Sequence, residues 1–421
     1  MININQLENQ TKVVLEEIKS VRSVAVGIWI KTGSMYEDNN NNGVAHLIEH
    51  MLFKGTKNRT AKKIAEDMSA IGGHINAFTA KEYTCFYAQT LDEHIETAIE
   101  ILSDMLLNSL FLESELEKEK KVILDEIDMY EDSPEEVVHD LFQENAWKEH
   151  PLSYNILGPK ENITNMKNES ILEFFKTQYC TDNIVISVAG HFESHKMLGI
   201  LNHYFINETT QSTQVMNPKP EYKKAFSYKN KEIEQMHLCI GFPGIHYHSN
   251  QLYVLAIFNT IFGGGMNSRL FQSIREEQGL AYSIYSYTGT YKDAGIFNIY
   301  VATNPSYVED VFKQIKEEIY KIKKEAITQD ELNKTKEQLK SNYIIGLEGT
   351  NSRMSVNGKS IAILDRIKTQ DEIIQEIDKV TIEDFQALAN QMLQYDKMGL
   401  SIVGKINHIN MEKVKELWEN E

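Results

Sequence analysis

The chain has 421 residues, of which 42% are hydrophobic and 25% are charged, and these values are typical of soluble globular proteins. Its formal net charge of −18 argues against nucleic acid and against an anionic membrane as partners, because both would repel it. The three cysteines are too few and too scattered for a disulfide framework, which fits a reducing compartment.

The N-terminal residues lack a basic segment followed by an apolar core, so they do not resemble a secretory signal. No apolar run approaches the ~20 residues that a helix needs to cross a bilayer. We therefore expect a cytoplasmic protein with no membrane partner.

Strands and helices are both predicted in the first 107 residues. Alternating apolar residues predict strands over 24–31 and within 75–90, whereas helical spacing predicts helices over 61–71 and 93–107. No nucleotide-binding fingerprint interrupts this order.

Between the first strand and the first of these helices lies the sequence His46-Leu47-Ile48-Glu49-His50. On a helix, the side chains of His46, Glu49 and His50 fall within about 100° of arc on one face. Two imidazoles one turn apart can bind one divalent cation with a carboxylate beside them, and H-x-x-E-H is the inverzincin signature. The alternative is a polar helix face that happens to carry two histidines.

Residues 111–130 predict a long amphipathic helix. The core-facing stripe comprises Leu112, Leu116, Glu119, Ile123, Glu126, Ile127 and Tyr130. Two carboxylates thus stand where apolar residues are expected, and a buried carboxylate needs a cation or a shifted pKa. A metal ion held by His46 and His50 would be that cation, unless the helix is rotated so that both glutamates face water.

These motifs resemble those of the inverzincin (pitrilysin-like) metallopeptidases, in particular the short two-domain branch that includes the catalytic subunit of mitochondrial processing peptidase and its bacterial relatives. In that family a ligand glutamate follows H-x-x-E-H by about 75 residues, with a further glutamate seven positions before it; here 75 residues separate His50 from Glu126, and Glu119 is seven before Glu126. The words Phe-Lys-Gly-Thr at 53–56, Gly-Gly-His-Ile-Asn-Ala-Phe-Thr at 72–79 and Arg-Glu-Glu-Gln-Gly-Leu-Ala-Tyr at 275–282 also match.

The motif spacing and the resemblance together assign His46, His50 and Glu126 as ligands of one Zn²⁺ per chain, which leaves a fourth position for water. Glu49 is expected to act as the general base, a role that rests partly on the resemblance. Glu119 is expected to orient a ligand or to balance the charge of the zinc, with the role of a competing ligand as the alternative.

The resemblance also implies two substrate-binding regions. Asn76, Ala77, Phe78 and Thr79 would form an exposed edge strand that pairs with an extended peptide, although the residues alone fit an ordinary core strand equally well. Arg275 and Tyr282 would hold substrate carbonyls and stabilise the oxyanion. From the residues alone, Tyr282 would be expected in the core and Arg275 on the surface.

The two halves of the chain look like copies of one unit. Glu-Leu-Glu-Lys-Glu-Lys at 115–120 recurs as Glu-Leu-Asn-Lys-Thr-Lys at 331–336, an offset of 216 at which Glu119 becomes Thr335 and Glu126 becomes Asn342. We predict a catalytic domain over 1–206, a linker over 207–228 and a domain without metal over 229–421. The fold class is α+β, with two homologous domains that each have a largely antiparallel sheet backed by helices.

The expected function is that of a zinc endopeptidase that hydrolyses unfolded or short peptides in an enclosed chamber, and a homodimer is the simplest way to build the four-domain chamber of the family. A non-catalytic helper subunit of a related peptidase complex is the alternative. A structural zinc site in a binding module is a third reading, for which four protein ligands would be expected. The acidic charge leaves open a preference for basic peptides.

Overall fold

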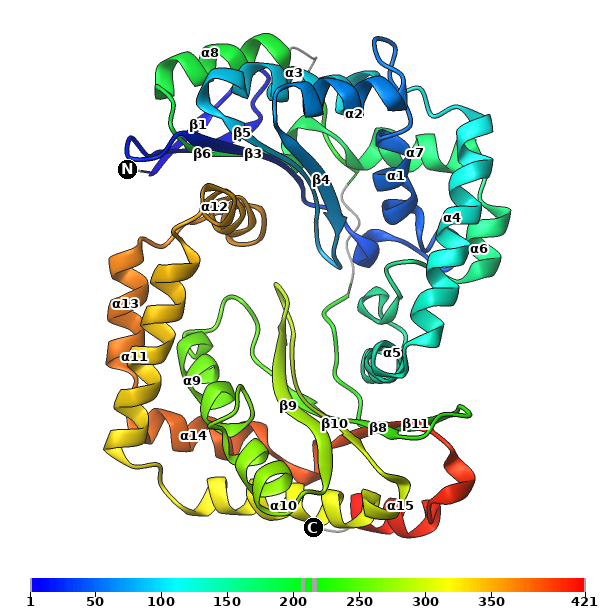
Figure 1. The fold of residues 1–421 in the computed structure, drawn as a ribbon, viewed down its shortest axis with the longest axis vertical. Helices are drawn as coiled ribbons and strands as arrows, with labels where there is room; N and C mark the ends of the chain where they lie inside the picture. The colour runs from blue at the N-terminus through cyan, green and yellow to red at the C-terminus, as the bar shows by residue number, and fades with distance from the viewer. Residues whose placement is uncertain (1, 206–208, 214–217, 420–421) are drawn as a thin grey trace. The chain divides into compact units, whose positions relative to one another are not determined.

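The computed structural model describes residues 2–205, 209–213 and 218–419 (Figure 1). The chain forms two compact units. Unit 1 comprises residues 1–128, 154–217 and 345–367, and unit 2 comprises residues 129–153, 218–344 and 368–421. Each unit therefore contains one segment from the other half of the sequence.

Unit 1 is built on a six-stranded sheet with the strand order β1-β2-β6-β3-β5-β4. The strands are β1 (Ile2–Gln6), β2 (Lys12–Glu17), β3 (Ser23–Ile30), β4 (His74–Thr79), β5 (Thr84–Leu91) and β6 (Ile184–Gly190). Neighbouring strands are antiparallel except β2 and β6, which are parallel. The sheet is thus largely antiparallel, as predicted.

Helices cover both faces of this sheet. They are α1 (Val44–Leu52), α2 (Ala61–Ala70), α3 (Ile95–Asn108), most of α4 (Glu113–Asp132), α6 (Lys160–Asn165), α7 (Asn168–Gln178), α8 (Ser194–Tyr204) and α12 (Thr350–Leu364). Figure 1 shows α12 on the opposite face of the sheet from α3 and α8. Strand β3 is almost entirely apolar because both of its faces are buried.

Unit 2 is built on a five-stranded sheet with the strand order β7-β11-β8-β10-β9. The strands are β7 (Phe226–Asn230), β8 (Met236–Pro243), β9 (Ala281–Thr290), β10 (Gly295–Thr303) and β11 (Gly399–Gly404). Only β7 and β11 are parallel. This order repeats β2-β6-β3-β5-β4 of unit 1 strand for strand.

The helices of unit 2 follow the same plan. They are α5 (Pro134–Ala146), α9 (Leu252–Phe262), a π-helical segment (Phe271–Glu277), α10 (Val308–Lys324), most of α11 (Gln329–Gly346), α13 (Gln370–Lys379), α14 (Ile382–Met392) and α15 (Met411–Glu419). Helix α5 packs on β8 and β11, as α12 packs on β3 and β6 of unit 1. The offset of 216 relates α5 to α12, so the two halves exchange equivalent helices.

The α+β class with two sheets backed by helices is confirmed. The predicted halves 1–206 and 229–421 differ from the compact units because residues 129–153 and 345–367 each pack against the sheet built by the other half. Within the predicted linker, residues 207–208 and 214–217 lie outside the described residues, and Phe226 already begins β7. In the described part of the chain, no helix is both long and apolar enough to cross a membrane.

Helix α4 begins two residues after its predicted start and ends two residues beyond its predicted end. Leu116, Ile123 and Ile127 are buried, as the stripe requires. The prediction is wrong at both ends, because Leu112 and Tyr130 are exposed. Burial at a helix end depends on which elements lie beside it, and periodicity carries no information on that.

Candidate metal centre

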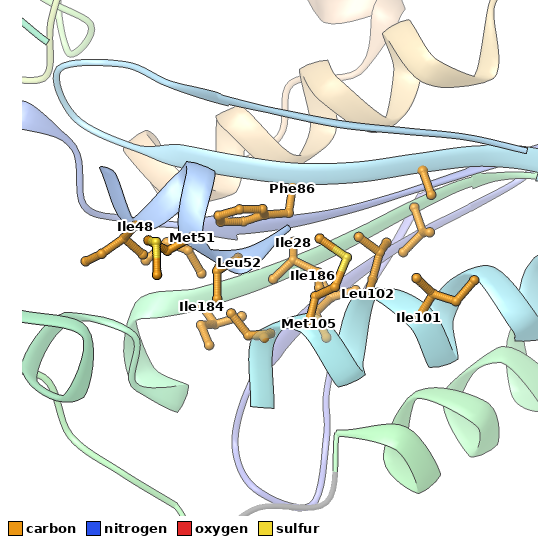
Figure 2. Close-up of a cluster of buried hydrophobic side chains, with 14 of the residues drawn as sticks. Ile28, Ile48, Met51, Leu52, Phe86, Ile101, Leu102, Met105, Ile184 and Ile186 are labelled. Carbon is orange, nitrogen blue, oxygen red and sulfur yellow. The ribbon is translucent and has the colours of Figure 1, made fainter. Parts of the chain in front are cut away.

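Helix α1 presents one face to the hydrophobic core and a different face to α4 and β4. Ile48, Met51 and Leu52 pack against the core residues Ile28 and Phe86 of the sheet (Figure 2). Because side chains three and four positions apart share a helix face, burying these three turns His46, Glu49 and His50 away from this core. The local sequence thus fixes the direction of the polar face.

A buried carboxylate holds the N-terminus of α1. Glu37 accepts hydrogen bonds from the backbone N–H groups of Gly43 (2.9 Å) and Ala45 (2.8 Å) and from the side chain of Asn42 (2.7 Å). Burial raises the pKa of Glu37 to about 7 despite these hydrogen bonds. Gly43 has φ +99°, a conformation that favours glycine, so the turn into the helix depends on this residue.

His46, His50 and Glu126 converge at the polar face of α1. Glu126 Oε2 lies 3.9 Å from His46 Nε2 and 3.7 Å from His50 Nε2. The ligand atoms of the three residues all lie within 4.8 Å of one another, and among the described residues this is the group of three whose geometry suits a metal ion. Zinc–ligand bonds of about 2.0–2.2 Å place two atoms on one ion at most about 4.4 Å apart, so the two nitrogen–oxygen distances fit.

The protonation of His46 also suits a ligand. Its side chain is buried, and this burial, together with the nearby His50, lowers the pKa of His46 to about 3. The imidazole is therefore neutral at physiological pH and has a lone pair to donate.

Glu119 contacts His50 at Nδ1, the ring nitrogen that does not face Glu126. The carboxylate is only 4% exposed, its Oε2 lies 3.1 Å from His50 Nδ1, and its Oε1 lies 2.8 Å from the ammonium of Lys54. His50 Nδ1 therefore donates to Glu119, which leaves Nε2 as the lone-pair nitrogen on the side of Glu126. The rotated-helix alternative is wrong, since Glu119 is buried and Glu126 reaches the histidines.

Glu49 lies beside this group without belonging to it. Thr79 Oγ1 donates a 2.5 Å hydrogen bond to Glu49 Oε2, so one carboxylate oxygen is held by the edge strand. Burial raises the pKa of Glu49, while the Thr79 hydrogen bond opposes the rise. This contact couples the candidate general base to the strand on which peptide binding is predicted.

Strand β4 is an edge strand, and it is not the core strand that the residues alone allowed. Ala80 N–H donates to Tyr83 O, which places the backbone of Phe78 and Asn76 toward β5 by the alternation of an antiparallel pair. The backbone of Ala77 then faces outward, and its N–H donates to Asn76 Oδ1 at 2.9 Å.

Arg275 and Tyr282 belong to unit 2, at the π-helical segment and at the start of the edge strand β9. The Arg275 guanidinium lies 4.8 Å from the ring centre of Phe271 and 5.9 Å from that of Tyr282. Tyr282 is 73% exposed, so the core position expected from the residues alone is wrong.

In unit 2, α9 occupies the position of α1, between the strands that correspond to β3 and β4. Its sequence, Leu-Tyr-Val-Leu-Ala-Ile-Phe-Asn-Thr-Ile-Phe, contains no histidine, cysteine or carboxylate. The second copy therefore keeps the helix and lacks the ligands.

Known proteins match the chain over nearly its full length. The family described as "Insulinase (Peptidase family M16)" matches residues 12–160, and "Peptidase M16 inactive domain" matches residues 165–339. An uncharacterized zinc protease of Bacillus subtilis is 42% identical over 396 residues, which cover 94% of this chain and 97% of the relative. One of Streptomyces coelicolor is 35% identical over 403 residues, covering 94% and 88%.

Solved structures share the fold. A protease from Helicobacter pylori superimposes with a TM-score of 0.91 at 22% identity over 96% of this chain and 99% of that one. A Pseudomonas fluorescens structure described as a peptidase M16 inactive domain gives 0.89 at 20% identity over 96% and 98%. The relatives named as zinc proteases indicate that the chain is of the zinc-peptidase class. This chain belongs to peptidase family M16, and the resemblance to the inverzincins is confirmed.

Proposed function

We propose that the chain is a zinc endopeptidase that hydrolyses short or unfolded peptides in an enclosed chamber. The convergence of His46 Nε2, His50 Nε2 and Glu126 Oε2 beside the Glu49 carboxylate carries this proposal. These three side chains would hold one zinc ion per chain. When bound, zinc supplies Lewis-acid polarisation of the peptide carbonyl and makes water nucleophilic near neutral pH.

Glu49 acts as the proton carrier in this proposal. Thr79 occupies Oε2, so Oε1 is the atom that accepts the proton of the attacking water and later delivers it to the leaving amine. Burial raises the pKa of the carboxyl, which makes the carboxylate a stronger base toward the proton of the attacking water.

The edge strand β4 binds the peptide in this proposal. The outward N–H and C=O of Ala77 can pair with an extended substrate, and Asn76 Oδ1 must release the Ala77 N–H when it does. Backbone pairing reads little sequence, so it suits peptides of varied composition. Arg275 and Tyr282 supply donors for the developing negative charge, a role that rests on the family resemblance.

A peptide-cleavage assay with one carboxylate variant tests the proposal. Wild type should cleave a quenched peptide library, lose activity with a chelator, and regain it with Zn²⁺. Glu49→Gln should retain zinc and lose about 10²–10⁴-fold in rate, because the general base is removed. Glu66→Gln, an exposed change on α2, is the matched control and should leave the rate unchanged. Zinc binding by wild type without cleavage of any peptide would instead favour the helper subunit.

We also propose a twofold homodimer, because one chain offers one metal site and family chambers contain four such domains. Arg275 and Tyr282 would then serve the zinc of the opposite chain. Mixing inactive Glu49→Gln and Tyr282→Phe chains at equal amounts should restore about a quarter of wild-type activity, since half the dimers are mixed and each has one intact site. Subunit exchange is checked by mass spectrometry. If subunits exchange and activity is not restored, Arg275 and Tyr282 act on the zinc of their own chain.

A cytoplasmic location is part of the proposal. Cys85, Cys180 and Cys239 are all buried as free thiols, which is the state expected in a reducing compartment. Fractionation of cells with an antibody to the chain would test it.

A further inference from the structure

Lys54 lies two residues after the end of α1, the helix that carries both candidate histidine ligands. Its backbone N–H donates to Met51 O at 3.0 Å, so the residue is attached to the last turn of that helix. Its ammonium lies 2.8 Å from Glu119 Oε1 on α4. The Lys54 side chain is 31% exposed and the Glu119 side chain 5%, so the ion pair is only partly open to solvent.

The two oxygens of Glu119 have different partners. Oε1 is held by Lys54 and Oε2 by His50 Nδ1, at 3.1 Å. A carboxylate fixed at both oxygens cannot rotate without breaking one of these contacts. The Nδ1 atom of His46, in contrast, is buried with no hydrogen-bond partner in the described part of the chain. Of the two histidines, His50 is therefore the one whose Nδ1 is held by a side-chain hydrogen bond.

These contacts close a ring between two helices. The path runs from α1 through Lys54 to Glu119 on α4, and from Glu119 back to His50 on α1. Glu126 lies two turns further along α4 and meets the histidines from there. These contacts therefore hold α4, which supplies the third ligand Glu126, as well as the imidazole of His50.

We propose that Lys54 is a positioning residue for the metal site: by holding Glu119 Oε1 it keeps Oε2 on His50 Nδ1 and so directs His50 Nε2 toward Glu126. This inference rests on the proposed zinc site and adds to it a residue that does not touch the metal. Partners of this kind typically change metal affinity by about 10–100-fold.

Positioning and simple charge predict opposite results for the neutral variant Lys54→Met. Removing a positive charge beside a cation site tightens cation binding by Coulomb's law. Removing an orienting contact weakens it, because the ligands must be ordered when the metal binds. The sign of the change therefore separates the two roles.

The test is Zn²⁺ affinity, measured by competition with a chromophoric chelator on the full chain. Lys54→Met should raise the Kd about 10-fold or more, and Lys54→Arg, which keeps a cationic donor, should restore most of it. Lys118→Met is the matched control, because Lys118 precedes Glu119 on α4 but is 67% exposed and pairs with Glu115. Its Kd should equal that of wild type.

A double-mutant cycle shows whether Lys54 acts through Glu119. In a Glu119→Gln background, Lys54→Met should cause no further loss of affinity. An equal loss in both backgrounds would overturn the inference, as would an unchanged or tighter Kd in Lys54→Met. Thermal unfolding of the metal-free variants checks that they fold, and Lys54→Gln replaces Lys54→Met if the latter does not. If wild type itself binds no zinc, the proposed function fails, whereas a failure of Lys54→Met alone leaves the zinc site intact.

Discussion

Trp29 in β3 and Gly241 in β8 occupy the same position in the two sheets. Each lies opposite the corresponding residue of the next strand, Val185 in β6 and Gly399 in β11. On the covering helices the large and small residues are reversed. Gly358 of α12 faces the tryptophan, and its equivalent in α5 at the offset of 216, Phe142, faces the glycine. A Cβ on Gly358 would lie 2.1 Å from Trp29 Nε1.

The same reversal appears from the other side: a Cβ on Gly241 would lie 2.3 Å from Phe142 Cζ. Each interface thus holds one large ring against glycine, and the ring comes from the sheet in unit 1 and from the helix in unit 2. Close packing constrains the total volume at a contact, while either partner can supply it.

The two helices make different polar contacts with their sheets. Met354 and Ile361 of α12 pack beside Trp29, and the same helix donates hydrogen bonds from Arg353 and Asn357 to the Glu16 carboxylate. At α5, Tyr287 Oη lies 2.6 Å from His139 Nδ1, and Tyr285 donates to Glu135 at 2.7 Å. The histidine–tyrosine contacts are thus a feature of α5, whereas α12 contains no histidine.

The largest difference between the copies should appear in zinc content. Wild type is expected to bind about one Zn²⁺ per chain, because α9 offers no ligand where α1 offers two. His50→Ala should lose it, as measured by elemental analysis after dialysis. His74→Ala, which changes an exposed histidine on β4, should keep the metal. Two zinc ions per wild-type chain, or full retention in His50→Ala, would contradict the ligand assignment.

Exchanging the large and small residues in unit 1 tests the packing comparison. Trp29→Gly should cost about 3–5 kcal/mol by leaving a cavity, and Gly358→Phe about 1–3 kcal/mol by overpacking. The double variant, which copies unit 2, should be more stable than the sum of the single effects by at least about 1 kcal/mol.

Urea unfolding measures these free energies. Gly199→Phe is the matched control: this helical glycine in α8 has nothing within 4 Å of a Cβ, so a side chain there should not destabilise. Strict additivity in the double variant would mean that the two positions do not share one volume.

Spacing along the chain predicted the parts of the site that lie on single helices. His46 and His50 share α1, Glu119 and Glu126 share α4, and the offset of 216 related the copies. Periodicity also placed α4 to within two residues at each end. These features depend on local geometry, which the sequence carries directly.

Contacts between distant segments were not predictable in this way. Lys54 contacts Glu119 although they are 65 positions apart, and neither segment contains a pattern that predicts this contact. Glu37 gave a weak signal, as an acidic residue shortly before a helix, where a carboxylate can bind free N–H groups. The exchange of α5 and α12 between the two halves was not predicted either, because the offset of 216 relates two segments and carries no information on which sheet each covers.

The polar interface of α5 should make unit 2 sensitive to acid. Burial lowers the pKa of His139 from its usual 6.5 to about 4; the charge of Glu135 opposes this shift and that of His237 adds to it. The tyrosines at 285, 287 and 300 that surround the ring have pKa values raised by burial, so they remain neutral.

Because the folded pKa of His139 lies below the unfolded one, the unfolded chain binds the extra proton first as the pH falls. The contribution of His139 to the free energy of unfolding should therefore decrease between about pH 6.5 and pH 4, by about 3 kcal/mol in total, and be constant above pH 6.5. It is read as the difference between wild type and His139→Gln, because His46 and Glu37 also change their protonation on unfolding in this range. Urea unfolding across this range, with chelator present throughout so that zinc loss does not contribute, measures the decrease. His139→Gln should remove this part of the pH dependence, whereas His74→Gln, at an exposed position in unit 1, should retain it. If the wild-type and His139→Gln curves run parallel, the proton is accommodated in the folded interface, and the histidine–tyrosine contact of α5 does not make unit 2 sensitive to acid.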